Sequence, residues 1–460
     1  MGRKKELLKN IIILGIGNII PRLSNLIILP LLTGILSKEE YGLYDLIVSL
    51  TTLFLPLATL QIQAAAFRFL IGEYKRENRT QIITNVICFT VLSSTLVLSI
   101  LFFILHQLNF YIKILIIIYY LIDIYVETIK QIARGLSQNK IYSKGIMVYS
   151  LTQLILFILL VTVLKYGLIG TLLSLIIGLL ISGIYISIKI KLNTFMNFKY
   201  FSKKTIIELI EYSWPMIPNS LSSWIVSLSD RMIITIFLGV EKTAIYAVAN
   251  KLPNLFTILQ GTFNLAWQEN ACISVNDREV NKYYEEMFDN LLKFLIGIMA
   301  MLIAITPILF KILIRGDYLN SYNHILILYL ATIFSSLSSY IGGIYLAYKK
   351  TKEIGITTFI AAIINIVINI TLIHKIGIYA ASFSTLLSYL ILFLYRSIKI
   401  KHIYGIKFKY FSIIKYFSIL FIMLILSILE QNFLNFIIGF ITFMVINKIL
   451  LLKIFNRFIS

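Results

Sequence analysis

Long runs of apolar residues, separated by short polar connections, dominate this chain. Four of them, at 11–35, 82–105, 146–164 and 433–452, each reach about 20 residues, enough for a helix to cross a hydrocarbon core of ~30 Å. No water is present in such a core, so each run has to be a helix that satisfies its own backbone groups. The pattern differs from the alternation of membrane β-barrel strands. We therefore predict an all-α integral membrane protein.

The same pattern predicts about 14 membrane-spanning helices in total. Composition agrees, because 59% of the residues are hydrophobic and 14% are charged, whereas soluble domains carry roughly 25% charged residues. The expected ranges are 11–35, 43–66, 82–105, 112–131, 146–164, 167–188, 213–238, 245–268, 287–313, 323–348, 354–373, 377–396, 411–429 and 433–452.

Basic residues gather at every second connection between these spans. This alternation predicts a multi-pass protein with both termini cytoplasmic. The connection at 269–289 departs from the pattern because it is acidic, but acidic residues carry little topogenic weight. The formal net charge of +21 thus indicates membrane orientation and contact with anionic lipids, not nucleic-acid binding. The basic groups lie within 3–9, 75–79, 130–144, 189–204, 349–352, 396–409 and 448–457.

Neither a cofactor nor a metal site is expected. The four histidines, at 106, 324, 374 and 402, are scattered without the spacing of metal ligands. A Walker phosphate-binding sequence is also missing, so ATP is not expected to drive the protein directly.

Two pairs of short segments indicate an internal repeat. Leu36–Tyr44 aligns with Leu238–Tyr246, a shift of 202 residues, and Lys165–Gly170 aligns with Lys375–Ala380, a shift of 210. The near-constant shifts predict a six-helix lobe at 1–190, a second six-helix lobe at 191–400 and two further helices at 401–460. Parallel repeats of this kind, with a substrate path between the lobes, are a transporter architecture.

Short motifs of small residues and helix ends occur in both halves of the chain: Pro21–Pro30, Leu36–Asp45, Lys350–Lys352, Asn365, Asn369, Gly377–Ser382 and Thr385. These motifs resemble those of bacterial oligosaccharide flippases of the polysaccharide transporter family, part of a superfamily that also holds multidrug and toxin extrusion transporters and lipid II flippases. The resemblance implies translocation of a polyprenyl-diphosphate-linked oligosaccharide across the cytoplasmic membrane for cell-surface polysaccharide biosynthesis, by alternating access of two lobes. We expect a monomer.

Four basic side chains are candidates for binding the anionic diphosphate. Arg22 lies about halfway along the first span, where a charge is costly and its fork suits phosphate oxygens. In related flippases arginines on the first span face a cationic cavity, and Arg22 resembles them in position. Arg231, Lys251 and Arg68 are the other candidates. The structural alternatives are an interhelical ion pair for Arg22 or Arg231, snorkelling for Lys251, and an end-of-helix anchor for Arg68.

Three carboxylates are candidates for coupling transport to H⁺ or Na⁺. Asp123 and Glu127 lie one turn apart on one face of the fourth span, with Lys130 a further turn along, and Asp230 lies on the seventh span. The structural alternative is a Glu127–Lys130 pair within the helix, with Asp123 satisfied by a neighbouring helix.

Two other functions compete with the flippase. A cation-coupled multidrug exporter of the same superfamily should line its pocket with carboxylates and aromatics, and Arg22 and Arg231 argue against it. A polysaccharide polymerase or glycosyltransferase of the membrane usually carries a large extramembrane loop, whereas no connection here exceeds about 25 residues. The chain is therefore predicted not to be an enzyme.

Overall fold

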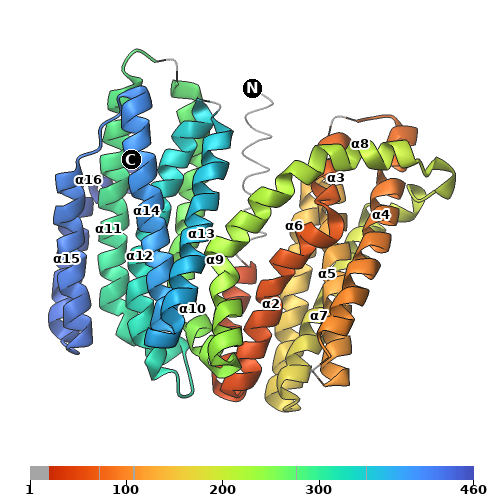
Figure 1. Cartoon of the computed structure of the whole chain (residues 1–460), viewed down its shortest axis with the longest axis horizontal. Coiled ribbons are helices and arrows are strands. Elements are labelled where there is room, and N and C mark those ends of the chain that lie inside the picture. The colour runs from red at the N-terminus through yellow and green to blue at the C-terminus, as the bar shows by residue number, and fades with distance from the viewer. Residues whose placement is uncertain (1–19, 72, 107–108, 276, 349, 460) are drawn as a thin grey trace. The chain divides into compact units, whose positions relative to one another are not determined.

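The computed structural model describes residues 20–71, 73–106, 109–275, 277–348 and 350–459, all of whose regular structure is helical (Figure 1). The fold class predicted from the sequence, an all-α membrane protein, is confirmed. After the helix Ile20–Ile35 come α2 (Lys38–Thr59), α3 (Ile62–Leu70), α4 (Arg76–Ile104), α5 (Phe110–Gly135), α6 (Asn139–Phe157), η1 (Ile158–Val163), α7 (Gly167–Lys189), η2 (Leu192–Thr194), η3 (Phe198–Tyr200), α8 (Lys203–Ser213), η4 (Trp214–Met216), α9 (Ile217–Leu238), α10 (Val240–Ser274), α11 (Val280–Leu313), η5 (Leu319–Ser321), α12 (Tyr322–Ala347), α13 (Thr351–Ile376), α14 (Tyr379–Tyr404), α15 (Tyr410–Ile428) and α16 (Asn432–Ile459).

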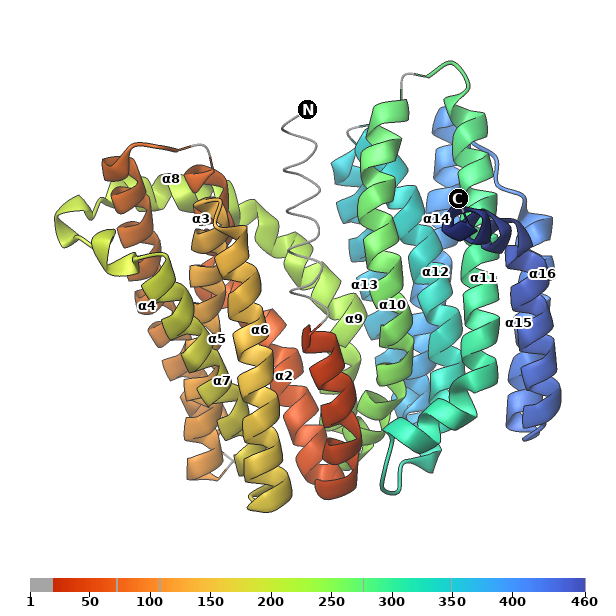
Figure 2. The ribbon, with the colours of Figure 1, turned by 180° about the vertical axis from the view of Figure 1, so that it is seen from behind.

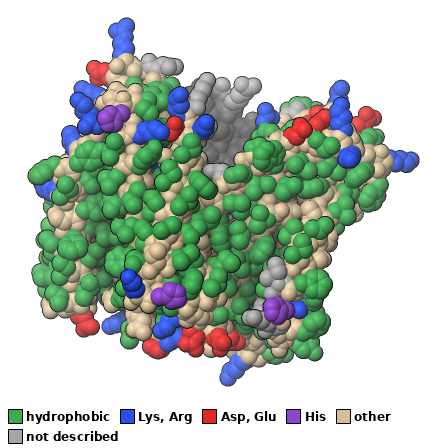
Figure 3. All heavy atoms as spheres, in the orientation of Figure 1, with side chains coloured by type: hydrophobic (Ala, Val, Ile, Leu, Met, Phe, Trp, Pro, Cys, Tyr) green, Lys and Arg blue, Asp and Glu red, His purple; other side chains and the backbone are tan. Residues whose placement is uncertain are grey.

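The predicted spans coincide with these helices, the second being divided between α2 and α3 and the fifth between α6 and η1, except that residues 11–19 lie outside the described part of the chain. By length and composition, nine of the described helices can cross a membrane, or ten if the bent pair 203–222 and 227–238 is one span. On the face drawn in Figure 3, charged side chains lie mainly near the ends of the helices, and hydrophobic side chains cover most of their middle parts. The chain is a multi-pass membrane protein.

The chain divides into two compact units, Met1–Trp224 and Ile225–Ser460. The first unit includes residues 191–224, which the predicted lobes assign to the second half, because α8 packs on α3 and α4. The second unit includes residues 401–460, because α15 and α16 pack on α11. The division into two six-helix repeats plus two helices stays a prediction.

The second predicted span is interrupted, which the sequence did not predict. It consists of α2 and α3, separated by Leu60 and Gln61, whose φ angles of 49° and 61° are left-handed. The exposed polar groups of the break are bonded within the same unit: Ser213 Oγ donates to Leu60 O (2.8 Å) and Gln61 Nε2 donates to Ser220 Oγ (3.0 Å). Such bonds are what allow a non-helical backbone at membrane depth.

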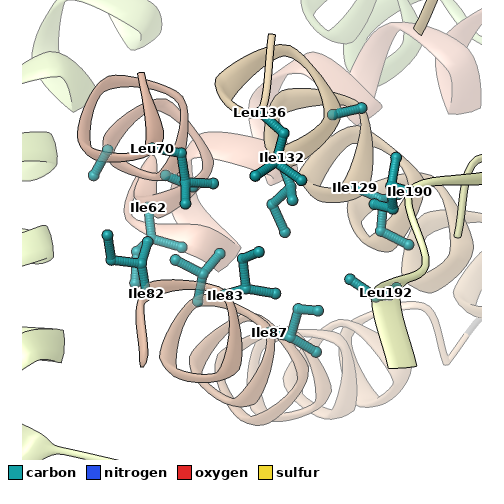
Figure 4. Close-up of a cluster of buried hydrophobic side chains, with 14 of the residues drawn as sticks. Ile62, Leu70, Ile82, Ile83, Ile87, Ile129, Ile132, Leu136, Ile190 and Leu192 are labelled. Atoms are coloured by element: carbon teal, nitrogen blue, oxygen red, sulfur yellow. The ribbon is translucent and has the colours of Figure 1, made fainter. Parts of the chain in front are cut away.

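A core of apolar side chains holds α3, α4 and α5 together at one end of the first unit (Figure 4). Ile62, Ile83, Ile129 and Ile132 within it are fully buried. At Gly135 a Cβ atom would lie 2.8 Å from Leu70 Cβ, so only glycine permits this approach of α5 to α3.

Glu40 joins two of the segments that carry the internal repeat. Ser37 and Glu40 form a capping box at the start of α2, with Ser37 N donating to Glu40 Oε2 (3.0 Å). The other oxygen, Oε1, accepts from Leu168 N (3.1 Å) and so caps α7. Gly167 has φ +51° and leaves room for this carboxylate, because a Cβ there would come within 2.5 Å of Oε1. By the shift of 202 residues the second unit has Lys242 at this position, which cannot make the same contact.

In the second unit α12 lies at the centre and contacts α10, α11, α13 and α14. Trp267 of α10 stacks on Tyr340 of α12 with ring centroids 4.2 Å apart, and its Nε1 donates to Tyr340 O (2.9 Å). Gly343 gives the indole its space, since a Cβ there would lie 2.7 Å from it. Figure 2 shows α10, α11 and α12 from the opposite side.

The acidic start of α11 lies against the basic segment between α14 and α15. Asp289 forms an ion pair with Lys409 (3.0 Å), and Glu285 Oε1 accepts from Lys407 N (2.6 Å). The hydrogen bond that Lys409 donates to Asp289 raises the pKa of Lys409. The acidic connection at 269–289 thus ends on the same side as the basic connection at 396–409, as predicted; that this side is cytoplasmic stays a prediction.

We predict that Glu40→Ala lowers the thermal stability of the protein in detergent. The substitution removes one cap from α2 and one from α7, each of which contributes about 1 kcal/mol, so the melting temperature should fall by several degrees. Glu39→Ala is the control, because Glu39 is exposed in the same helical turn. Equal melting temperatures for the two variants would show that the Glu40–Leu168 bond does not hold α2 to α7.

Candidate functional site: a buried carboxylate in the second unit

Asp230 is the centre of a buried polar network formed by four helices. It lies in α9 and is 1% exposed. Tyr246 Oη of α10 donates to Asp230 Oδ2 (2.7 Å), and Thr385 Oγ1 of α14 donates to the same oxygen (2.6 Å). Asn369 Nδ2 of α13 donates to Oδ1 (2.7 Å). The carboxylate therefore accepts three hydrogen bonds from neutral groups.

A second layer of the network lies one helical turn away on α13. Asn365 is fully buried; its Oδ1 accepts from Ser229 Oγ (3.4 Å), and its Nδ2 lies 3.5 Å from Ser384 Oγ. Asn365, Asn369 and Thr385, which appeared in the sequence only as parts of a motif, all lie in this network. The spacing of Asn365 and Asn369 places both amides on one face of α13.

Asn369 has a carbonyl oxygen without a hydrogen-bond partner among the described residues, although its side chain is fully buried. Buried polar atoms are normally bonded, so an orphan acceptor needs an explanation such as an unseen water or ion. This orphan belongs to the amide whose nitrogen binds Asp230. The site thus combines one negative charge with neutral oxygens and an acceptor that lacks a donor.

This chemistry suits a monovalent cation or a proton. Hard cations prefer oxygen ligands, and a buried carboxylate is stabilised by neutralisation of its charge. Among the described residues no group of three or more His, Cys, Asp or Glu side chains could hold a metal ion.

Arg231, the neighbour of Asp230 in sequence, is 5% exposed. Its guanidinium carbon lies 6.0 Å from the centre of the Tyr246 ring, at the limit of a cation–π contact. Tyr246 therefore contacts both the carboxylate and the guanidinium side of this pair.

The other three basic candidates differ from Arg231 in their exposure. Arg22 is exposed in the helix Ile20–Ile35, and Arg68 is exposed in α3. Lys251 is half-buried in α10. Arg22 and Arg68 belong to the first unit and Lys251 to the second. Their binding of cargo stays a prediction.

The predicted acidic pair on α5 combines with a lysine. Glu127 Oε1 accepts from Lys130 Nζ (2.6 Å), which is the intrahelical pair considered as the alternative for Glu127. Asp123 is half-buried near Tyr119, Tyr120 and Tyr149, within range of electrostatic interaction. The first unit therefore places two acids and one base together in α5.

Sequence reasoning missed Arg396, which it placed in a basic connection. Arg396 lies inside α14 and is 4% exposed. Its guanidinium donates to Thr357 Oγ1 (2.9 Å), Ser338 O (2.9 Å), Ile354 O (3.2 Å) and Thr358 Oγ1 (3.0 Å). All four acceptors are neutral, and they belong to α12 and α13. The charge of Arg396 is thus dispersed over a clamp that joins three helices.

The chain and its fold resemble those of known proteins. Residues 7–269 match the sequence profile of the family described as polysaccharide biosynthesis protein. Since the match spans more than half of the chain, the protein belongs to this family. A search of curated proteins found no match.

Solved structures show the same fold. The chain is 20% identical to the lipid II flippase MurJ in its inward closed conformation, with a TM-score of 0.75 over 96% of this chain and 100% of that one. An inward-facing multidrug resistance MATE family transporter of the MOP superfamily is 12% identical, with a TM-score of 0.64 over 82% of this chain and 98% of that one. A MOP superfamily transporter from Pyrococcus furiosus is 14% identical, with a TM-score of 0.57 over 86% of this chain and 96% of that one.

The predicted resemblance is thereby confirmed for the family. The solved structures add that the chain shares the fold of the lipid II flippase MurJ and of a MATE family transporter.

We predict that Arg396→Lys destabilises the second unit. Lysine keeps the charge but cannot reproduce the four bonds of the planar guanidinium, and each lost bond to a charged group removes about 1.5–3 kcal/mol. The melting temperature in detergent should fall clearly. Arg68→Lys, at an exposed position, should leave it unchanged; a matching loss in both variants would argue against the clamp.

Proposed function

We propose that this protein is a flippase for a polyprenyl-diphosphate-linked oligosaccharide and that a monovalent cation or proton bound at Asp230 drives its transport cycle. The cargo passes from the cytoplasmic to the outer leaflet of the cytoplasmic membrane during cell-surface polysaccharide biosynthesis. Two lobes expose the cargo site alternately to the two sides.

Membership of the polysaccharide biosynthesis protein family carries this proposal. A saccharide assembled on a lipid at one membrane face has to cross the hydrocarbon core before it reaches the cell surface, and its polar head cannot cross unaided. A solved structure that shares the fold over 96% of this chain is that of a lipid II flippase. Family and fold therefore support the same kind of substrate.

Four basic side chains are proposed to bind the diphosphate of the cargo. Arg22, Arg231, Lys251 and Arg68 are the residues that would attract the head group, because their charge is opposite to that of the phosphates. Arg231 is buried in the conformation described. Its contact with cargo accordingly requires another state of the transport cycle.

Asp230 is favoured over Asp123 and Glu127 as the coupling residue. Its carboxylate has three neutral donors and an orphan acceptor nearby, whereas Glu127 already has Lys130 as a partner. Binding of a cation at Asp230 would draw together oxygens of α9, α13 and α14. A ligand that binds one conformation more tightly shifts the equilibrium toward it.

Arg22→Ala should strongly reduce translocation without disturbing insertion. Loss of a charged bond to phosphate costs about 1.5–3 kcal/mol, so transport of a fluorescent polyprenyl-diphosphate glycan by proteoliposomes should fall about tenfold or more. Arg231→Ala should behave similarly, and Arg76→Ala, at the exposed start of α4, is the control. Transport at the wild-type rate in Arg22→Ala would remove Arg22 from the cargo site. Export of organic cations with no glycan transport by the wild type would instead favour the multidrug exporter.

Asp230→Asn should remove the dependence of transport on an ion gradient. The amide is nearly the same size as the carboxylate but has no charge to attract a cation. In proteoliposomes, an imposed Na⁺ or proton gradient should stimulate the wild type and should not stimulate the variant. Asp277→Asn removes an exposed carboxylate and should retain the stimulation. If Asp230→Asn responds to the gradient like the wild type, coupling does not occur at this site.

A further inference from the structure

An apolar surface groove runs along α4 in the first unit. Two hollows, of about 430 Å³ and 360 Å³, lie on it and share Thr95 and Leu121. The first is formed by α4, α5 and α7, and the second by α4 and α5. Both α4 and α7 pack on α5 and lie side by side with it in Figures 1 and 2. From Thr90 to Phe103 the groove is about 20 Å long, at 1.5 Å per residue.

Short side chains on one face of α4 create this groove. Ser94, Thr95 and Ser99 line it, and neighbouring large residues such as Leu96 project elsewhere. The hydroxyls of Ser94, Thr95 and Ser99 donate to carbonyls of their own helix. The groove therefore offers an almost entirely apolar wall, suited to a hydrocarbon chain.

Thr90 makes the end of the groove different from ordinary lipid-facing surface. Its side chain lines the larger hollow, is 1% exposed and has a hydroxyl without a partner among the described residues. A buried hydroxyl is normally bonded. The orphan points to a ligand with a polar group near this end of the groove.

Exposed lysines gather at the same end. Ile188, the last groove residue of α7, is followed by exposed Lys189 and Lys191, while Ile190 and Leu192 between and after them are buried in the core of Figure 4. Burial of Ile190 and Leu192 holds this stretch of backbone in place, and Lys189 and Lys191 are exposed on its other side. Neither lysine forms an ion pair with a described carboxylate.

The segment after α7 adds further positive charge and is attached to α4. Thr84 Oγ1 donates to Phe195 O (3.0 Å), and Asn85 Nδ2 donates to Tyr200 O (3.0 Å). Thr90 lies five residues beyond Asn85, about 8 Å along the helix. The attached segment carries exposed Lys199, Lys203 and Lys204, with Phe198 and Phe201 exposed beside them.

We propose that the groove and these lysines form a binding site for an anionic phospholipid of the leaflet that meets the basic ends of the helices. One acyl chain lies in the groove between α4 and α7, and the phosphate lies at Lys189 and Lys191. Each lysine near a membrane surface contributes about 1 kcal/mol to binding of an anionic lipid. The aromatic residues Phe198 and Phe201 hold the segment at the interface.

Native mass spectrometry of the purified full-length protein tests this site. The protein is exposed to phosphatidylglycerol or to phosphatidylcholine with identical acyl chains, and bound lipid is measured. The wild type should retain phosphatidylglycerol in preference to phosphatidylcholine. Excess inorganic phosphate should not displace it, because phosphate lacks the chain. Equal retention of both lipids, or displacement by phosphate, would overturn the proposal.

Two variants separate the chain from the head group. Thr95→Trp fills the groove where the two hollows meet and should reduce retention of both lipids, whereas Leu96→Trp, one residue away and outside the groove, should not. The double variant Lys189→Gln, Lys191→Gln should lower phosphatidylglycerol affinity roughly 30-fold, about fivefold for each lysine. It should leave phosphatidylcholine unaffected.

The charge control is Lys401→Gln, Lys407→Gln, at exposed positions of the second unit. All four variants should melt at the wild-type temperature, since the changed side chains are exposed or face the groove. A variant of the groove or of Lys189 and Lys191 that behaves like its control would contradict the site.

Discussion

Inside a hydrocarbon core no water can hydrogen-bond a polar group, so every charge there needs partners supplied by the protein. This constraint explains the interior of the second unit. Asp230 accepts from a tyrosine, a threonine and an asparagine. Arg396 donates to two threonines and two carbonyls. The hydrogen-bond partners named for both charges are neutral, and each charge joins α14 to other helices.

The hydrogen-bond network around Arg396 is nearly complete, whereas the network around Asp230 is not, so we assign the two charges different roles. Four of the five N–H donors of Arg396 are used, which describes a structural clamp. The network of Asp230 leaves the carbonyl oxygen of Asn369 without a donor. An incompletely satisfied network is costly, and a small cation would satisfy it. In the first unit the charge of Glu127 is instead neutralised by an ion pair with Lys130 on the same helix.

The sequence predicted the spans well because hydrophobic length is a local property. It also selected Asp230, since a charge within an apolar run is visible without a structure. Its partners were not identifiable as a set, because Tyr246, Asn369 and Thr385 are distant in sequence and meet only in the fold. Arg396 was assigned to a connection because it lies near other basic residues. The break at Leu60 and Gln61 escaped prediction because neither residue is a glycine or proline, and Pro56 was the single local signal.

Direct cation binding tests the central claim, that Asp230 is an ion site. Equilibrium binding of radioactive Na⁺ to the purified protein should show one saturable site that Asp230→Asn removes, or, if the ligand is a proton, uptake of one proton per chain that the same variant loses. Wild-type protein that binds neither ion, or an Asp230→Asn variant that binds as the wild type does, would contradict this account.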